Sequence, residues 1–485
     1  MKILIAASEA VPFCKTGGLA DVVGALGQKL GAAGHDVCLV LPKYRRVEAS
    51  ALEGGIARPI ELPLGGQKVT ASLRFLHRRA VSVYLVDYPT FYDREGLYGF
   101  DGKDYPDNDR RFILFCRAAL EGCRAVGFKP DVIHCHDWQT ALIPAYLKRS
   151  YGSDPFFADT ASVLTIHNLA YQGNFGREAL DQAGFSAEDF ASDRFEYYGK
   201  FSFLKAGILC ADRLSTVSAT YAREIQESEE RGFGFEGLLR KRGSDLEGIL
   251  NGIDTELWNP ETDSYLPARF SARDHARGKA VCKRAVQKEA GLRLEPQTPL
   301  VGIVSRLDYQ KGLDLAIAAI APRLGRCQLA VLGEGDAALQ QEFASMARRH
   351  PGMAHFRSGF DEAFAHLLYA GCDLFLMPSR FEPCGLGQMI AMRYGGVPVV
   401  TRTGGLADTV SESSSEGRPA NGFVAKPGDT QDLGAALDRA LAGYAGRVKA
   451  AMESRFSWDQ SVNAYLELYR KAIESRAGSA TRGRR

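Results

Sequence analysis

The fold is decided by the N-terminal stretch that runs from KILIAA at Lys2–Ala7, through KTGGLAD at Lys15–Asp21, to DVCLVL at Asp36–Leu41. Both apolar runs are short and rich in branched residues, which is typical of strands buried on both faces of a parallel sheet. Between them, Leu19–Ala33 has the length of a helix and follows a glycine-bearing loop. This order of strand, loop, helix and strand predicts a parallel sheet covered by helices, the α/β class.

Further apolar runs extend this pattern and then restart it. Strands of the first half are predicted at Val81–Val86, Val132–His134, Val163–Ile166 and Arg213–Val217. An interdomain connection is predicted near Gly243–Leu257, where the apolar period is lost, and a long surface loop at Asn259–Ala280. In the second half, strands are predicted at Leu300–Val304, Gln328–Leu332, Asp373–Met377 and Pro398–Thr401, with a helix beginning in Lys311–Ile320.

We therefore predict two Rossmann-like α/β domains, residues 1–245 and 246–460, followed by a C-terminal segment, 461–485. In that segment Ser461–Glu474 has an amphipathic helical pattern, and we expect it to pack back on the N-terminal domain. Ser475–Arg485 is basic and lacks large apolar residues, so we expect it to be disordered.

Composition narrows the class of protein. The 485 residues are 45% hydrophobic and 24% charged, which is ordinary for a soluble globular protein. The formal charge of +2 gives no reason to expect a nucleic-acid partner. The ten cysteines contain no C-x-x-C pair and fit reduced thiols in the cytoplasm. No apolar run is long enough to span a membrane, and Glu9 ends the first one, so neither membrane binding nor a signal peptide is expected.

One six-residue sequence occurs twice. TGGLAD stands at Thr16–Asp21 and again at Thr403–Asp408, each time after a basic residue, Lys15 or Arg402. Chance is the alternative, because glycine, leucine and alanine are common. Six identities with the same basic flank favour a shared task, a loop that enters a helix N-terminus where free N–H groups can face an anion.

In the first half, three strand ends or loops carry candidate binding residues. Lys15 adds a positive charge to a glycine loop that can approach a phosphate or a sugar, although a twin glycine alone more often only turns the chain. Asp137 follows a strand and either accepts hydrogen bonds from sugar hydroxyls or caps the next helix. His134 and His136 beside it do not predict a metal site, because no second ligand cluster lies near them in sequence. His167 ends another strand, and a single histidine there is also compatible with a structural role.

The second half carries the denser signal. Arg306 and Lys311 lie five residues apart across a strand-to-helix turn, which suits a diphosphate, whereas two solvated basic residues are the alternative. PSRFEPCGLGQ at Pro378–Gln388 places Glu382 in a rigid turn before Gly385 and Gly387. One carboxylate beside free backbone amides suits a sugar and a phosphate.

Together these motifs resemble the bacterial glycogen synthases and plant starch synthases. They span nearly the whole chain in the order typical of that family. The resemblance implies the GT-B fold, two Rossmann-like domains facing across a deep cleft. The matching stretches are KTGGLADVVG at Lys15–Gly24, CHDW at Cys135–Trp138, HNLAYQG at His167–Gly173, NGID at Asn251–Asp254, SRL with QKGLD at Ser305–Asp314, and SRFEPCGL at Ser379–Leu386.

The resemblance also implies an activity and roles for individual residues. The expected reaction is transfer of glucose from ADP-glucose to the non-reducing 4-OH end of an α-1,4-glucan, glycogen or a maltooligosaccharide, with retention of configuration. The expected catalytic residues are Glu382, His167, Lys311 and Arg306. The expected substrate-binding residues are Lys15, Gly18, Asp21, Asp137, Asn168, Asn251, Phe360, Cys384, Gly385, Leu386 and Gly387.

No metal and no cofactor are expected, because fixed cations and amide dipoles can stabilise a diphosphate leaving group without them. The chain departs from the family at Gly387, where relatives usually carry Thr, and at Gln139, where bacterial members often carry His. The change at Gly387 leaves the choice between ADP- and UDP-glucose open. The alternatives are another GT-B transferase or an epimerase with a small acceptor, or a sugar-binding protein with a decayed site.

Overall fold

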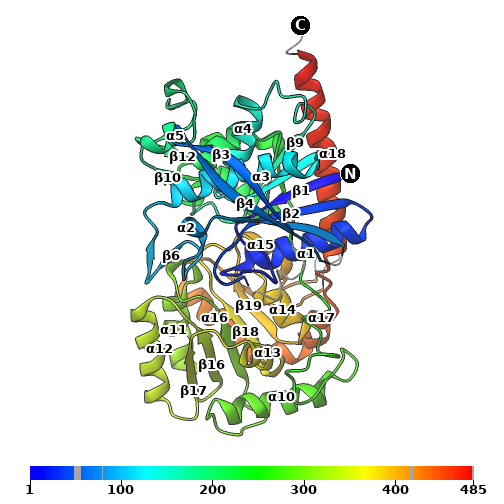
Figure 1. The fold of residues 1–485 in the computed structure, drawn as a ribbon. Coiled ribbons are helices and arrows are strands. Elements are labelled where there is room, and N and C mark those ends of the chain that lie inside the picture. The colour runs from blue at the N-terminus through cyan, green and yellow to red at the C-terminus, as the bar shows by residue number, and fades with distance from the viewer. Residues whose placement is uncertain (48–55, 79, 415–418, 483–485) are drawn as a thin grey trace. The chain divides into compact units, whose positions relative to one another are not determined.

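The computed structural model describes residues 1–47, 56–78, 80–414 and 419–482 (Figure 1). The chain divides into two compact units. Unit 1 comprises Met1–Val217, Ala222–Ile249 and Trp458–Arg485, and unit 2 comprises Ser218–Tyr221 and Leu250–Ser457. Each unit has a largely parallel sheet with helices packed on it, which confirms the predicted α/β class.

Unit 1 is built on a nine-stranded sheet in which the seven strands from β14 to β5 run parallel. β3 and β4 add an antiparallel hairpin at one edge. In spatial order the strands are β14 (Leu246–Gly248), β13 (Arg213–Thr216), β9 (Ala161–Ile166), β8 (Val132–His136), β1 (Lys2–Ala6), β2 (Asp36–Pro42), β5 (Val81–Asp87), β4 (Gln67–Arg78) and β3 (Ile56–Leu64).

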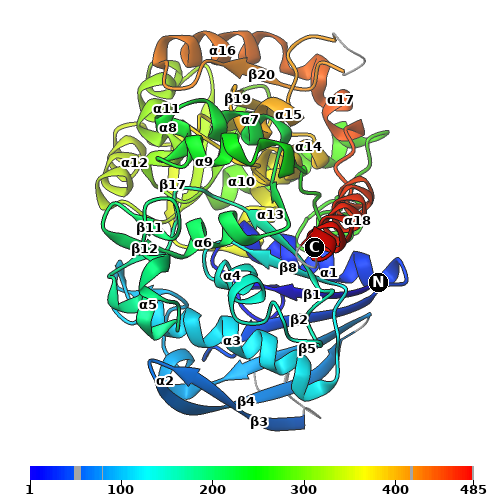
Figure 2. The same cartoon turned by 90° about the horizontal axis from the view of Figure 1, so that it is seen from above.

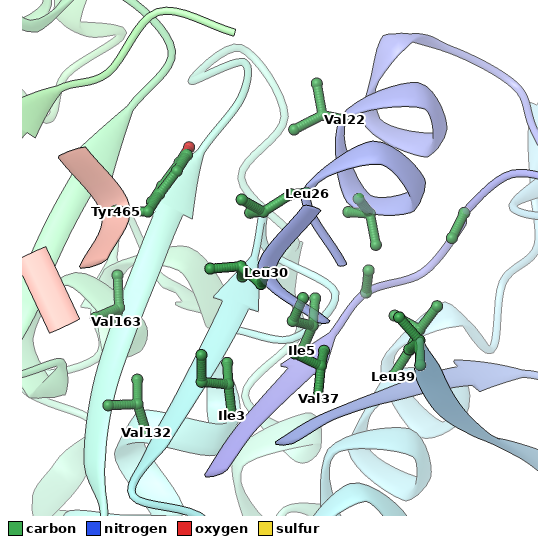
Figure 3. Packing of buried hydrophobic residues seen from close by; sticks show 14 of the residues in the cluster. Ile3, Ile5, Val22, Leu26, Leu30, Val37, Leu39, Val132, Val163 and Tyr465 are labelled. Atoms are coloured by element: carbon green, nitrogen blue, oxygen red, sulfur yellow. The ribbon is translucent and has the colours of Figure 1, made fainter. Parts of the chain in front are cut away.

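Two helices from opposite ends of the sequence cover one face of this sheet. α1 (Gly18–Ala32) and α18 (Trp458–Arg482) pack beside each other (Figure 2). Leu26 and Tyr465 from these helices share one buried cluster with Ile3 and Ile5 of β1 (Figure 3). Leu4 alternates with these isoleucines and is also fully buried, so β1 is covered on both faces, as its unbroken apolar run predicts.

Two of the remaining helices of unit 1 contact its sheet. α3 (Asn108–Val126) contacts β3 and β5, and α4 (Leu142–Arg149) contacts β9. The other helices are α2 (Pro89–Tyr92), α5 (Glu178–Gln182), α6 (Phe203–Cys210), α8 (Glu229–Gly232) and α9 (Glu236–Lys241), while α7 (Ala219–Glu227) takes residues from both units. Short strands pair as β6 (Gly99–Phe100) with β7 (Lys103–Asp104), and β12 (Lys200–Ser202) with β10 (Asn174–Phe175) and β11 (Glu196–Tyr197).

Unit 2 has a six-stranded sheet in which every pairing is parallel. The order is β17 (Ala354–Ser358), β16 (Gln328–Gly333), β15 (Leu300–Val304), β18 (Leu374–Met377), β19 (Val397–Thr401) and β20 (Phe423–Ala425). The helices are α10 (His275–Glu289), α11 (Leu313–Ile320), α12 (Ala337–Arg349), α13 (Glu362–Gly371), α14 (Gly387–Arg393), α15 (Gly404–Thr409), α16 (Thr430–Gly443) and α17 (Val448–Glu453).

Both sheets reverse their direction of winding beside the first strand of the unit. In unit 1 the chain builds outward from β1 to β2 and β5, then returns to place β8 on the other side of β1. In unit 2 it builds from β15 to β16 and β17, then returns to place β18 beside β15. Open α/β sheets bind ligands outside the carboxyl ends of the strands at such a reversal. The topology therefore selects the ends of β1 and β8, and of β15 and β18.

Two features of the fold, the β3–β4 hairpin and the segment Asn259–Ala280, differ from the sequence predictions. The β3–β4 hairpin was not predicted, although Gly65 and Gly66, both with positive φ, supply its turn. The segment Asn259–Ala280, predicted as a surface loop, includes the first turns of α10. Within it Asp263 is buried, and its carboxylate accepts hydrogen bonds from His366 Nδ1 at 2.7 Å and from Tyr394 OH at 2.6 Å.

None of the described helices is long and apolar enough to cross a membrane.

The C-terminal segment is also different. The prediction of disorder from Ser475 is wrong as far as Arg482, because α18 continues to that residue. Adding residues to an anchored helix costs little once its first turns are formed, and α18 is anchored by its buried tyrosines. The last three residues of the predicted tail lie outside the described part of the chain.

Candidate active site

In unit 1 the Lys15 loop is organised by a carboxylate that the sequence analysis did not single out as a site residue. Glu9 follows β1 and is only 3% exposed. Its carboxylate accepts hydrogen bonds from Thr16 N and Oγ1, from Gly17 N at 3.3 Å and from Tyr98 OH at 3.0 Å. Burial raises the pKa of Glu9 against the opposing effect of these donors. A charged residue close to the end of a buried strand was the signal that could have marked Glu9.

Lys15 itself is partly exposed. Its Nζ lies 2.8 Å from Oδ1 of Asp21, which stands in the first turn of α1. Gly18 begins that helix. The structure therefore brings together three predicted binding residues, Lys15, Gly18 and Asp21, near the end of β1.

Asp137 ties together the ends of two neighbouring strands. It follows β8 with a φ of 56°, and its Oδ1 accepts a hydrogen bond at 2.7 Å from the backbone N–H of His167, which follows β9. The backbone of Asn168 also donates to this carboxylate, and desolvation raises the pKa of Asp137 to about 7. The side chain thus joins two loops and does not cap α4, which begins at Leu142.

His167 is partly buried, and its imidazole contacts a second histidine. Nε2 of His167 lies 2.8 Å from Nδ1 of His136, the last residue of β8. Burial lowers the pKa of His167 to about 3, so the ring is neutral near neutral pH. Asn168, the next residue, uses its side-chain oxygen to accept a hydrogen bond from Ala170 N.

In unit 2 the two predicted catalytic residues Glu382 and Lys311 form an ion pair. Nζ of Lys311 lies 2.6 Å from Oε2 of Glu382, which also accepts a hydrogen bond from Ser379 Oγ at 2.9 Å. The Glu382 side chain is 6% exposed and that of Lys311 17%. Lys311 ends a 3₁₀ turn, Tyr309–Lys311, and α11 begins only after Gly312. The helix therefore starts later than predicted, because Gly312 adopts a φ of 61°.

Arg306 is placed differently from Lys311. It follows β15, its side chain is 52% exposed, and its guanidinium lies 3.3 Å from the carboxylate of Asp308. Each of the two predicted diphosphate-binding cations is thus paired with a different carboxylate. Phe360 follows β17 and is 81% exposed.

The turn after Glu382 is fixed by neighbouring side chains. Asn251 is buried and donates to the sulfur of Cys384 from both its backbone and its side chain. The buried amide of Gln388 donates to the carbonyls of Cys384 and Gly385. Leu386 and Gly387 lead into α14. In this structure Asn251 therefore supports the Glu382 loop, while its contact with a sugar stays a prediction.

Each of the two TGGLAD copies leads into a helix, but the two copies are packed differently. In the second copy, Gly405 N donates to Glu382 O at 3.0 Å, and a Cβ added to Gly404 would lie 2.0 Å from the same oxygen. A Cβ at Gly17, the matching position in the first copy, would meet nothing within 4 Å. The first copy is therefore open, and the second is packed against the backbone of the Glu382 turn.

Chemically, each unit offers polar groups beside the carboxyl ends of its parallel strands. Unit 1 supplies a cation, a carboxylate and a neutral imidazole, and unit 2 supplies a buried carboxylate held by a lysine. Among the residues whose structure is described, no three His, Cys, Asp or Glu side chains gather as metal ligands. All ten cysteines are buried free thiols.

Comparison with known proteins identifies the family. Residues 2–241 match the family described as "Starch synthase catalytic domain", and residues 287–455 match "Glycosyl transferases group 1". The chain is 46% identical to the glycogen synthase of Elusimicrobium minutum over 98% of its own length and 100% of that protein's. It is 47% identical to the glycogen synthase of Syntrophotalea carbinolica, with 98% and 99% covered.

Solved structures agree with this assignment. The catalytic domain of starch synthase IV from Arabidopsis thaliana, described as bound to ADP and acarbose, superimposes with a TM-score of 0.89 at 36% identity and covers 98% of this chain and 99% of its own. A sucrose-phosphate synthase from Thermosynechococcus elongatus shares the fold, with a TM-score of 0.60 at 18% identity. These matches confirm the GT-B fold and the glycosyltransferase class expected from the motifs. The chain belongs to the glycogen and starch synthase family.

Proposed function

We propose that this enzyme elongates an α-1,4-glucan by moving glucose from ADP-glucose to the non-reducing 4-OH end, with retention of configuration and release of ADP. The acceptor is glycogen or a maltooligosaccharide, and the reaction takes place in the cytoplasm. The observation that carries the proposal is the buried Lys311–Glu382 pair at the strand reversal of unit 2. A charged pair at that position is suited to a ligand with both hydroxyls and phosphates.

The proposed glucosyl transfer requires that the leaving diphosphate be stabilised. Breaking the bond between glucose and the diphosphate builds negative charge on the leaving oxygen, and fixed cations lower the barrier without moving a proton. Lys311 and Arg306 take this role. Lys311 is paired with Glu382, so a bound diphosphate gives this lysine a second anionic partner. Glu382 engages the transferred glucose as its anomeric carbon becomes cationic.

The other predicted residues complete the site. Lys15 approaches the donor phosphate from unit 1, with Gly18 and Asp21 shaping its loop. His167, Asn168 and Asp137 lie near the glucose, and Asn251 is a further sugar contact. The backbone of Cys384, Gly385, Leu386 and Gly387 faces the phosphates, and Phe360 packs against adenine.

The preference for ADP-glucose is supported by the Arabidopsis relative, which is described as bound to ADP. Gly387 bears on this preference, because relatives usually carry threonine at this position. A Cβ there would lie 3.1 Å from the ring of Phe375 and 3.4 Å from Tyr369 OH, so the side chain of a threonine would crowd these rings. Compared with threonine, the glycine keeps the backbone N–H and lacks the hydroxyl and the methyl group.

The deciding experiment offers ADP-glucose and UDP-glucose, both labelled in the glucose, to the enzyme with glycogen. We expect label in the polymer from ADP-glucose at a kcat/KM at least about tenfold above that from UDP-glucose, a difference of about 1.4 kcal/mol. Equal use of both donors would contradict the nucleotide preference. Label that enters only a small acceptor such as glucose would contradict glucan elongation and favour another GT-B transferase.

A further inference from the structure

Three histidines form a ladder across the carboxyl ends of β8 and β9. The rings of His134 and His136 have centroids 4.1 Å apart, and those of His136 and His167 lie 5.1 Å apart. His134 and His136 are fully buried, and His167 is partly buried. The ladder therefore runs from the interior of unit 1 to a residue that we propose contacts the sugar.

The inner end of the ladder is held by a helix from the other end of the sequence. Nδ1 of His134 lies 2.8 Å from the hydroxyl of Tyr469 in α18, and Nε2 lies 2.6 Å from Thr165 Oγ1 in β9. Both nitrogens of His134 are thus engaged, and Tyr465 of α18 also packs against this ring. The buried face of α18 fixes where His134 lies and hence where His136 can stack.

His136 has one bonded and one unbonded nitrogen. Its Nδ1 faces Nε2 of His167 at 2.8 Å, whereas its Nε2 is buried and has no hydrogen-bond partner. Burial lowers the pKa of both rings, so each carries a single proton near neutral pH. A buried N–H without an acceptor is rarer in proteins than an unused acceptor lone pair. The proton of His136 therefore belongs on Nδ1, where it can be donated.

We infer that His136 is a positioning residue, whose Nδ1–H donates to Nε2 of His167 and fixes His167 as the tautomer that carries its proton on Nδ1. Because Nε2 of His167 then accepts, its Nδ1–H becomes a donor. In the part of the chain that the structure describes, no group accepts from this Nδ1. His167 therefore recognises a hydrogen-bond acceptor, which is an oxygen atom of the sugar. This last step rests on the proposed function, whereas the tautomer does not.

The tautomer can be measured without turnover. The chain has nine histidines, so labelling with ¹³C,¹⁵N-histidine gives few signals, and His167→Gln identifies that of His167. The ¹³Cδ2 and ring ¹⁵N shifts separate the two neutral tautomers. We expect the Nδ1–H form of His167 in the wild-type protein and a mixture of tautomers in His136→Leu. The Nε2–H form in the wild type, or no change in His136→Leu, would overturn the inference.

Kinetics with glycogen test whether positioning matters. We expect His136→Leu to lower kcat by about tenfold, the effect of one lost hydrogen bond, with the donor KM unchanged. His136→Asn should recover most of the loss, because its amide nitrogen can occupy the place of Nδ1. His77→Leu, which changes an exposed histidine of β4, should behave as wild type. Equal kcat in His136→Leu and wild type would overturn the positioning role. If no donor is used at all, the proposed function fails while the tautomer measurement still decides the inference.

Discussion

At the scale of single residues, the Glu382 side chain is held by more contacts than its position in a turn predicts. Its carboxylate is shared by Lys311 and Ser379. We expect Glu382→Gln to keep the bond from Ser379, to retain ADP binding, and to lose at least about 100-fold in kcat, because it removes the charge that we propose stabilises the anomeric carbon. Steady-state kinetics together with calorimetric titration of ADP separate these two effects.

A matched control for this variant is Glu362→Gln, which removes a carboxylate from an exposed position at the start of α13. It should leave kcat unchanged. Glu382→Ala should also destabilise the fold by about 3 kcal/mol, because it leaves Lys311 largely buried without its anion. Wild-type turnover in either Glu382 variant would contradict the catalytic role assigned to this residue.

Asp137 gives a prediction about pH. Desolvation raises the pKa of this carboxyl to about 7, against an ordinary value of about 4 in the unfolded chain. The folded chain therefore binds the proton more tightly, and the stability it gains from protonation is full below pH ~4 and is lost as the pH rises through about 7. We expect the stability of Asp137→Asn relative to wild type to increase across this range by about 2 kcal/mol, allowing for partial exposure.

The measurement is thermal or urea unfolding of both proteins near pH 5 and near pH 8. Asp131→Asn serves as the control, because Asp131 is exposed at the opposite end of β8. A difference between Asp137→Asn and wild type that does not depend on pH would refute the raised pKa.

At the scale of elements, the two TGGLAD copies show that one sequence can serve two packing tasks. Gly404 has a φ of 42° and touches the carbonyl of Glu382, whereas Gly17 has a φ of −153° and open space where a Cβ would lie. We expect Gly404→Ala to lower both the melting temperature and kcat by displacing the Glu382 turn. Gly17→Ala should preserve the melting temperature. Equal melting temperatures for the two variants would show that close packing at Gly404 is unimportant.

The sheet reversals are the elements that turn separate motifs into sites. The ends of β1 and β8 collect Glu9, the Lys15 loop and Asp137, and the ends of β15 and β18 collect Arg306 and the Glu382 turn. Sequence order cannot reveal this, because β1 and β8 are neighbours in space but about 130 residues apart, as the pairing of Ile3 with Val132 shows.

At the scale of the whole molecule, the proposed catalytic residues belong to two compact units, with His167 in one and Glu382 in the other. We propose that both act on one glucose, and we therefore expect donor binding to change the arrangement of the units. We expect the radius of gyration from solution scattering to decrease when ADP-glucose is added, and to stay constant when glucose alone is added. Scattering curves that superimpose with and without ADP-glucose would contradict closure on the donor.

The sequence determined the fold class, the principal strands, the family and the reaction class. Short branched runs such as Leu300–Val304 are typical of strands buried on both faces of a parallel sheet, and the family motifs keep their order along the chain. Which residue supports which was decided only by tertiary structure. Tyr469 and His134, and likewise Lys311 and Glu382, are far apart in sequence but joined by hydrogen bonds. Glu9 is close in sequence to the Lys15 loop, but no hydrophobic pattern predicts its hydrogen bonds there. Hydrogen bonds and desolvation depend on atomic distances after packing, and hydrophobic periodicity carries no information about those distances.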